Sequence, residues 1–176
     1  MPSNEHVVLV NGCVKVDLVE GVEEVVTNIK DSGNYYFSIK NYTDANRKYK
    51  KAIRYIDWCK TQSDKINSYD EMKLSEIKLV CLLNQAAVKL KMNLFREALY
   101  LCDKGLLIDG KCAKAFYRRG QARIGLNDYE MALKDLKTAL LLVPNNKSIK
   151  LEIISLRNRM RNYLLLEKAR FEKMLK

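Results

Sequence analysis

The sequence has little proline, glycine and histidine, and each shortage limits what the protein can be. Two prolines and seven glycines leave few helix breakers in a chain rich in Leu, Lys, Ala and Glu, a composition that favours helices. The only histidine is His6, so the sequence offers almost no residue that could act as the base in Ser/His/Asp or Cys/His catalysis. No hydrophobic run approaches the ~20 residues of a membrane-spanning helix, and the N-terminus lacks the basic region of a secretory signal. We therefore expect a cytoplasmic, helical protein.

The cysteines form no recognisable framework. Five of them are scattered along the chain without a CxxC motif, which argues against a Cys/His zinc site. We expect most of them to be small apolar core residues in a reducing compartment. The sequence thus predicts neither a metal site nor a cofactor.

Positive charge exceeds negative charge by a wide margin. The formal net charge is +11 at pH 7, which favours an acidic peptide, a nucleic acid or an anionic membrane without choosing among them. The chain has no RNA- or DNA-binding motif, and its aromatics do not alternate with charge on an evident face. We therefore expect neither nucleic acid nor membrane as a partner.

Residues 1–20 differ from the rest of the chain. Two β-prone runs, VVLV at 7–10 and CVKV at 13–16, flank Asn11 and Gly12. Asn-Gly is the strongest short hairpin signal, because a type I′ turn needs positive φ at both positions. The segment is predicted to be either a loose tail or a hairpin, which would be marginal on its own.

Helical periodicity begins near Val22. A polar stretch at 61–70 interrupts it and predicts a loop. The predicted helices cover about 22–39, 42–60, 71–92, 94–108, 111–125, 128–142 and a last segment from near 146 to the end.

Small residues recur with a period of 34. They form the pairs Ala86 and Gly120, Ala98 and Ala132, and Gly105 and Ala139. A 34-residue period built from helix pairs is typical of tetratricopeptide repeats, in which small residues allow the paired helices to approach closely. Gly33, Ala45 and Ala52 have the same spacing from one another as Gly120, Ala132 and Ala139. Ala45 precedes Ala98 by 53 residues, which is one period plus 19 residues. Those extra residues should lengthen the second and third helices.

The repeat predicts an all-α fold of three tetratricopeptide helix pairs in a right-handed solenoid. The repeats should cover about 26–60, 79–112 and 113–146, within a domain at 21–176. A long helix at about 147–175 should cap the stack, because terminal repeats expose an apolar face. Its apolar stripe consists of Ile149, Ile153, Leu156, Met160, Tyr163 and Leu164. Beyond the stripe, LLLEKARFEKMLK at 164–176 should project from the stack. This basic helix has three interpretations: capping alone, helix-in-groove binding by calmodulin, or contact with an acidic surface.

Five polar residues fall on the first helices of the repeats, which line the concave groove of such a stack. Lys30 and Asn34 are four apart, as are Lys114 and Arg118, so each pair shares a helix face. Asn84 lies 34 residues before Arg118 and has the same repeat position. Ammonium, guanidinium and carboxamide groups together predict a site for carboxylates. Asn84 alone could instead satisfy a backbone group inside the stack.

These motifs resemble the tetratricopeptide domain of large-immunophilin co-chaperones, of the cyclophilin 40 and large FK506-binding protein type. The matching segments are IKDSGNYYF at 29–37, LLNQAAVKLKM at 82–92 and KAFYRRGQARIGLNDYEMALKDL at 114–136. The resemblance implies a two-carboxylate clamp that holds the C-terminal Glu-Glu-Val-Asp tail of heat-shock protein 90. The clamp then falls on Lys30, Asn34, Asn84, Lys114 and Arg118. The sequence does not distinguish a preference for the tail of heat-shock protein 90 from a preference for that of its 70-kDa counterpart.

Three further expectations follow from the resemblance and the repeat. Tyr36, Tyr49 and Phe116 are predicted to lie in the core, whereas Phe37 is either core or an apolar wall that meets the valine of the tail. HVVLVNGC at 6–13 resembles the last strand of a cyclophilin isomerase domain, whose remainder has no counterpart here, so we expect no enzyme activity. The alternative function is an adaptor that acts through its basic C-terminal helix.

Overall fold

The computed structural model describes residues 8–10, 13–15, 20–62 and 68–175. Strands β1 (Val8–Val10) and β2 (Cys13–Lys15) pair antiparallel, with Val10 opposite Cys13. This register is that of the predicted hairpin, although the Asn11-Gly12 turn itself lies outside the described residues.

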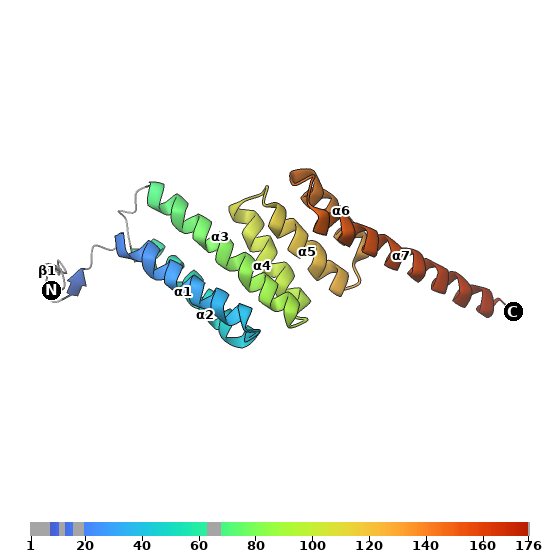
Figure 1. Ribbon diagram of the computed structural model, residues 1–176, viewed down its shortest axis with the longest axis horizontal. Coiled ribbons are helices and arrows are strands. Elements are labelled where there is room, and N and C mark those ends of the chain that lie inside the picture. The colour runs from blue at the N-terminus through green and yellow to red at the C-terminus, as the bar shows by residue number, and fades with distance from the viewer. Residues whose placement is uncertain (1–7, 11–12, 16–19, 63–67, 176) are drawn as a thin grey trace. The chain divides into compact units, whose positions relative to one another are not determined.

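Every other element in the described ranges is a helix, which confirms the all-α class (Figure 1). The bounds are α1 (Glu20–Ser38), α2 (Tyr42–Gln62), α3 (Ser68–Lys91), α4 (Phe95–Ile108), α5 (Ala113–Gly125), α6 (Tyr129–Leu142) and α7 (Lys147–Met174). Helices α2 and α3 have 21 and 24 residues, whereas α4, α5 and α6 have 14, 13 and 14. The 19 additional residues therefore lengthen these two helices, and the predicted loop at 61–70 is wrong at both ends.

The three turns inside the helix pairs are built alike. Lys40, Asn93 and Asn127 have φ of 62°, 58° and 61°, and they are separated by 53 and 34 residues, the offsets of the repeat. In each turn the next backbone N–H donates to the carbonyl five residues earlier, at 2.9 Å, which is the Schellman arrangement that ends a helix. The second helix of each pair then starts two residues after the positive-φ residue.

The chain divides into two compact units, 1–81 and 82–176, and each is described by itself. In the first unit α1 packs against α2, with Val26, Ala52 and Ile56 fully buried. Gly33 is required at this contact, because a Cβ there would lie 2.7 Å from the ring of the buried Tyr49. This arrangement explains physically why the repeat places a small residue at that position.

The second unit contains the end of α3 and helices α4 to α7. Ala98, Ala132 and Ala139 have no exposed surface, and a Cβ on Gly120 would lie 3.0 Å from Leu136. The predicted small positions therefore lie where helices approach closely.

Burial raises the pKa of the Cys81 and Cys102 thiols to about 12, and Cys59 is also buried, so these thiols are core groups as predicted.

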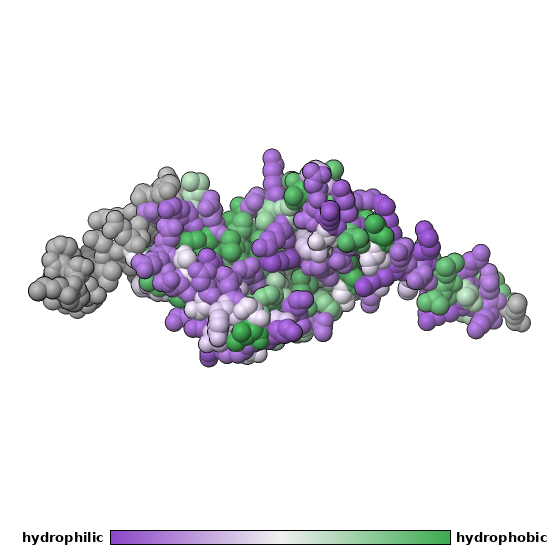
Figure 2. All heavy atoms as spheres, in the orientation of Figure 1, coloured by the Kyte–Doolittle hydropathy of each residue, from purple (hydrophilic) through white to green (hydrophobic). Residues whose placement is uncertain are grey.

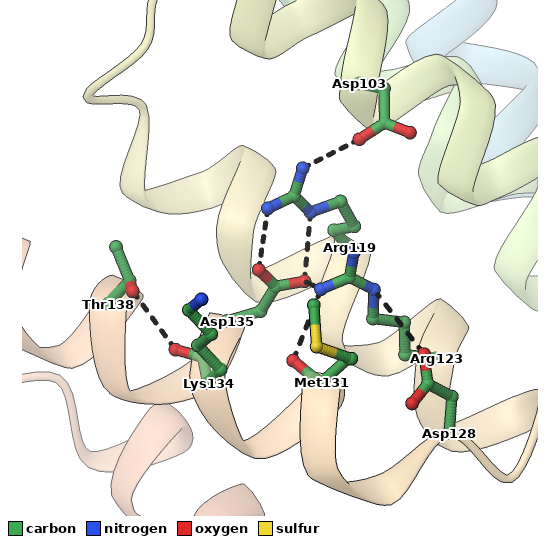
Figure 3. A network of polar contacts seen from close by, with 8 residues as sticks. All are labelled: Asp103, Arg119, Arg123, Asp128, Met131, Lys134, Asp135 and Thr138. Atoms are coloured by element: carbon green, nitrogen blue, oxygen red, sulfur yellow. Dashed lines mark hydrogen bonds and ion pairs between the residues drawn. The ribbon is translucent and has the colours of Figure 1, made fainter.

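A polar network links α4, α5 and α6 inside the second unit (Figure 3). The Asp135 carboxylate, which is 2% exposed, accepts two hydrogen bonds from Arg119 and one from Arg123. Arg119 also donates to Asp103 of α4 at 2.7 Å. Hydrogen bonds to Asp135 are the main cause that raises the pKa of Arg119. This network compensates the burial of one carboxylate with two guanidinium groups.

Helix α7 packs on α6 only through its first half. Ile149, Ile153 and Leu156 are buried, and Met160 packs against the same cluster. The predicted stripe is buried over a shorter length than expected, since Tyr163 and Leu164 are 53% and 66% exposed, whereas the exposure of Leu165, Leu166 and Phe171 agrees with the predicted projection of the last segment. The apolar stripe of α7 is longer than the part of α7 that contacts α6, and the C-terminal half of α7 projects past α6 (Figure 1).

Candidate carboxylate-binding site

In the first unit, Lys30 and Asn34 lie one turn apart on α1. Lys30 Nζ is 3.3 Å from Asp31 Oδ1, and Asn34 Nδ2 donates to the same oxygen at 3.1 Å. Tyr49 Oη donates to Asn34 Oδ1 at 2.6 Å. The structure thus brings the two predicted donors together around one carboxylate oxygen.

The repeat pattern does not predict the roles of Asp31 and Tyr49, because it assigns Tyr49 to the core only. The ring of Tyr49 is indeed buried, at 1% exposure, but its hydroxyl reaches the face of α1 that carries Asn34. The available signal was spacing, because Asp31 precedes Asn34 by three residues and so lies on the same side of the helix.

Phe37 follows Asn34 by three residues and is half-buried. Its ring packs against Tyr42 with centroids 5.6 Å apart. Because Phe37 is only half-buried, part of it remains accessible on the face that carries the two donors. Of the other predicted core aromatics, Tyr36 and Phe116 are also half-buried.

In the second unit, Lys114 and Arg118 lie on the first two turns of α5. The first turn, from Ala113, contains no acidic residue, and the side chain of the N-cap residue Cys112 makes no capping hydrogen bond. The positive end of the helix dipole is thus combined with two cations. Partial burial and then the Arg118 guanidinium lower the pKa of Lys114. Among the described residues, no carboxylate forms an ion pair with Lys114. This end of α5 is suited to an anion.

Arg118 also lines a cleft of about 400 Å³ between α3, α4 and α5. The other residues that line it are Ala87, Leu90, Lys91, Phe95, Tyr117 and Gln121. Asn84 is half-buried on α3, three residues before Ala87 and seven before Lys91, so it lies on the face that continues into the cleft. The described residues contain no group of three or more His, Cys, Asp or Glu side chains arranged to hold a metal. Among them, no helix is long and apolar enough to cross a membrane.

Comparison with known proteins gives the family. A protein-family model described as "Tetratricopeptide repeat" matches residues 113–146. The second such domain of human RPAP3, solved in complex with the HSP70 peptide SGPTIEEVD, is 30% identical, with a TM-score of 0.61 over 78% of this chain and 98% of that domain. The chain belongs to the tetratricopeptide-repeat family.

Two other tetratricopeptide proteins extend the comparison. The human peptidyl-prolyl cis-trans isomerase FKBP4 is 31% identical over 151 residues, which cover 86% of this chain and 32% of that protein. This match confirms the predicted resemblance to large immunophilins, and the chain spans about a third of the length of the curated relatives it matches. The myosin chaperone UNC-45 from C. elegans, solved with a Hsp90 peptide, is 28% identical, with a TM-score of 0.64 over 78% of this chain and 14% of that one.

Proposed function

We propose that this chain is a co-chaperone module that binds the acidic C-terminal tail of heat-shock protein 90, ending in Glu-Glu-Val-Asp. The observation that carries the proposal is the cationic start of α5, where Lys114 and Arg118 lie without an acidic residue in the first helical turn. Arginine offers a planar fork for two oxygens and lysine a point charge. Relatives at 28% and 30% identity that were solved with Hsp90 and HSP70 peptides support the same class of ligand.

We assign the same carboxylate-binding role to two donors of the first unit. Lys30 and Asn34 already hold a carboxylate oxygen, that of Asp31, so this face of α1 has the chemistry to hold another. Asn84, on the face of α3 that continues into the Arg118 cleft, completes the set. Phe37, with its partly accessible ring, would contact the valine of the tail. The tail of the 70-kDa heat-shock protein would offer the same carboxylates.

The decisive test is titration of a peptide ending in Glu-Glu-Val-Asp against the same peptide with an amidated C-terminus. We expect a large loss of affinity on amidation, because the donors that hold the terminal carboxylate lose their charged partner. Arg118→Ala should also abolish binding while leaving the helical circular dichroism unchanged. Equal affinity for the acid and the amide would refute the clamp.

We further propose that the chain acts by binding and not by catalysis. The curated relative is a prolyl isomerase, but the matched region is about a third of its length, and the family model that matches describes the repeat. A proline-isomerisation assay on this chain should therefore show no rate above the uncatalysed one. Measurable acceleration would overturn this part of the proposal.

A second candidate function rests on the projecting half of α7. Leu164, Leu165, Leu166 and Phe171 are each at least 60% exposed, and Figure 2 shows hydrophobic and hydrophilic side chains side by side at that end of the helix. From Lys147 on, nine residues are basic and three acidic. Such a helix could place its apolar residues in the hydrophobic groove of calmodulin, and its basic residues suit calmodulin or another acidic partner. Deleting the segment after Tyr163 should then remove that binding, whereas substitutions at Lys114 should not affect it.

A further inference from the structure

One internal carboxylate occupies both α1 donors of the proposed clamp. Asp31 Oδ1 lies 3.3 Å from Lys30 Nζ and accepts from Asn34 Nδ2 at 3.1 Å. These are the two groups that α1 would present to a carboxylate of the peptide. The free chain therefore already contains a carboxylate in contact with its own ligand-binding donors.

The contact between Lys30 and Asp31 is exchangeable. The Asp31 side chain is 56% exposed and that of Lys30 is 21% exposed, so solvent and ligand reach the carboxylate. Adjacent residues on a helix do not face each other, so Lys30 must turn along the helix surface to meet Asp31. Exposed ion pairs of this kind contribute little, roughly 0.2–1 kcal/mol, and an incoming carboxylate can replace this one.

Asn34, by contrast, is fixed as a donor. The Tyr49 hydroxyl donates to Asn34 Oδ1 at 2.6 Å, and the Tyr49 ring is anchored in the core against Gly33. With its oxygen engaged from that side, the carboxamide presents its NH₂ group to whichever carboxylate is in place. A ligand therefore replaces Asp31 without the amide having to turn.

We propose that Asp31 is an intramolecular competitor of the peptide carboxylate, which occupies the α1 donors in the free chain and lowers affinity for the tail. This inference rests on the proposed function and adds a residue that regulates the same site. Neutralising Asp31 removes both the internal pair and a negative charge beside the incoming carboxylate. A loss of about 0.5–1 kcal/mol, the upper part of the range for an exposed pair, corresponds to about a two- to fivefold gain in affinity.

The test compares Asp31→Asn with a matched control, Asp57→Asn. Asp57 is 51% exposed and pairs with Lys78, so both variants lose one negative charge from an exposed ion pair in the same unit. Titration of the Glu-Glu-Val-Asp peptide should give a two- to fivefold lower Kd for Asp31→Asn. The Kd of the control should stay within about 1.5-fold of the unmodified chain, and the gain should shrink in high salt, where such pairs are screened.

A second variant, Asp31→Ala, covers the case in which an asparagine keeps the hydrogen bond to Asn34. If neither variant gains affinity over the control, or if both lose it, Asp31 is not a competitor and the inference fails. The amidated peptide separates this outcome from failure of the clamp. If the unmodified chain binds acid and amide equally, the proposed function fails; if it discriminates between them and the Asp31 variants gain nothing, only this inference fails.

Discussion

Replacing Lys114 by glutamine should stabilise the free chain while removing tail binding. Lys114 lies in the first turn of α5, which has no acidic residue, so its charge opposes the helix dipole at a cost of about 0.3–1 kcal/mol. Arg118, one turn on, adds like-charge repulsion of about 0.2–0.5 kcal/mol. No ion pair to Lys114 occurs among the described residues. The expected gain is about 0.5–1.5 kcal/mol, or roughly 1–6 °C in Tm.

Thermal melts with and without saturating Glu-Glu-Val-Asp peptide measure both effects. The peptide should raise the Tm of the unmodified chain by mass action and leave that of Lys114→Gln unchanged. Lys137→Gln, in the middle of α6, controls for the loss of one positive charge and should shift Tm by less than about 1 °C. A Lys114→Gln variant that is less stable than the unmodified chain, or that still binds the tail, would refute the reasoning.

The pH dependence of the same comparison has a defined sign. Partial burial, followed by Arg118, lowers the pKa of Lys114 from its ordinary value of 10.5, so the folded state holds this proton less tightly than the unfolded state does. The cost is fully present below the lowered pKa and disappears as pH rises past 10.5. The stability advantage of Lys114→Gln should therefore be constant near neutrality and shrink in alkaline solution, as urea unfolding at several pH values can show.

Three further predictions concern stability. Asp135→Asn should cost about 3–5 kcal/mol in urea unfolding, because it leaves two guanidinium groups without their buried carboxylate. Asp103→Asn should cost about 1 kcal/mol or less, because the Asp103 side chain is 46% exposed. Equal costs for the two variants would contradict the network. Gly33→Ala should lower stability by about 1–3 kcal/mol, since its Cβ would lie 2.7 Å from a buried tyrosine ring, and Gly21→Ala, with nothing within 4 Å, should not. Lys40→Gly should raise the free energy of unfolding by about 0.4–1 kcal/mol, because φ there is 62°; a loss would show that the lysine side chain itself contributes.

The sequence by itself determined the helix pairs and their register. Small residues recur where the paired helices of the repeat approach closely, so the spacing of Ala98 and Ala132 indicates the period from the sequence alone. The same register placed Asn84 and Arg118 at equivalent repeat positions. Helix ends were predicted less well around 61–70, because a polar composition there is as compatible with exposed helical turns as with a loop.

Only the tertiary structure decided how particular side chains pair. The contact between Asp31 and Asn34, and the reach of the Tyr49 hydroxyl across from α2, depend on rotamers and on the distance between helices, which periodicity does not specify. The same holds for Asp135, which meets arginines of α5 because α6 packs closely there. In α7 the apolar spacing continues past Met160, and the stripe stops being buried where α6 no longer lies beside it. Leu133, near the start of α6, lines one hollow with Met160 and Leu164.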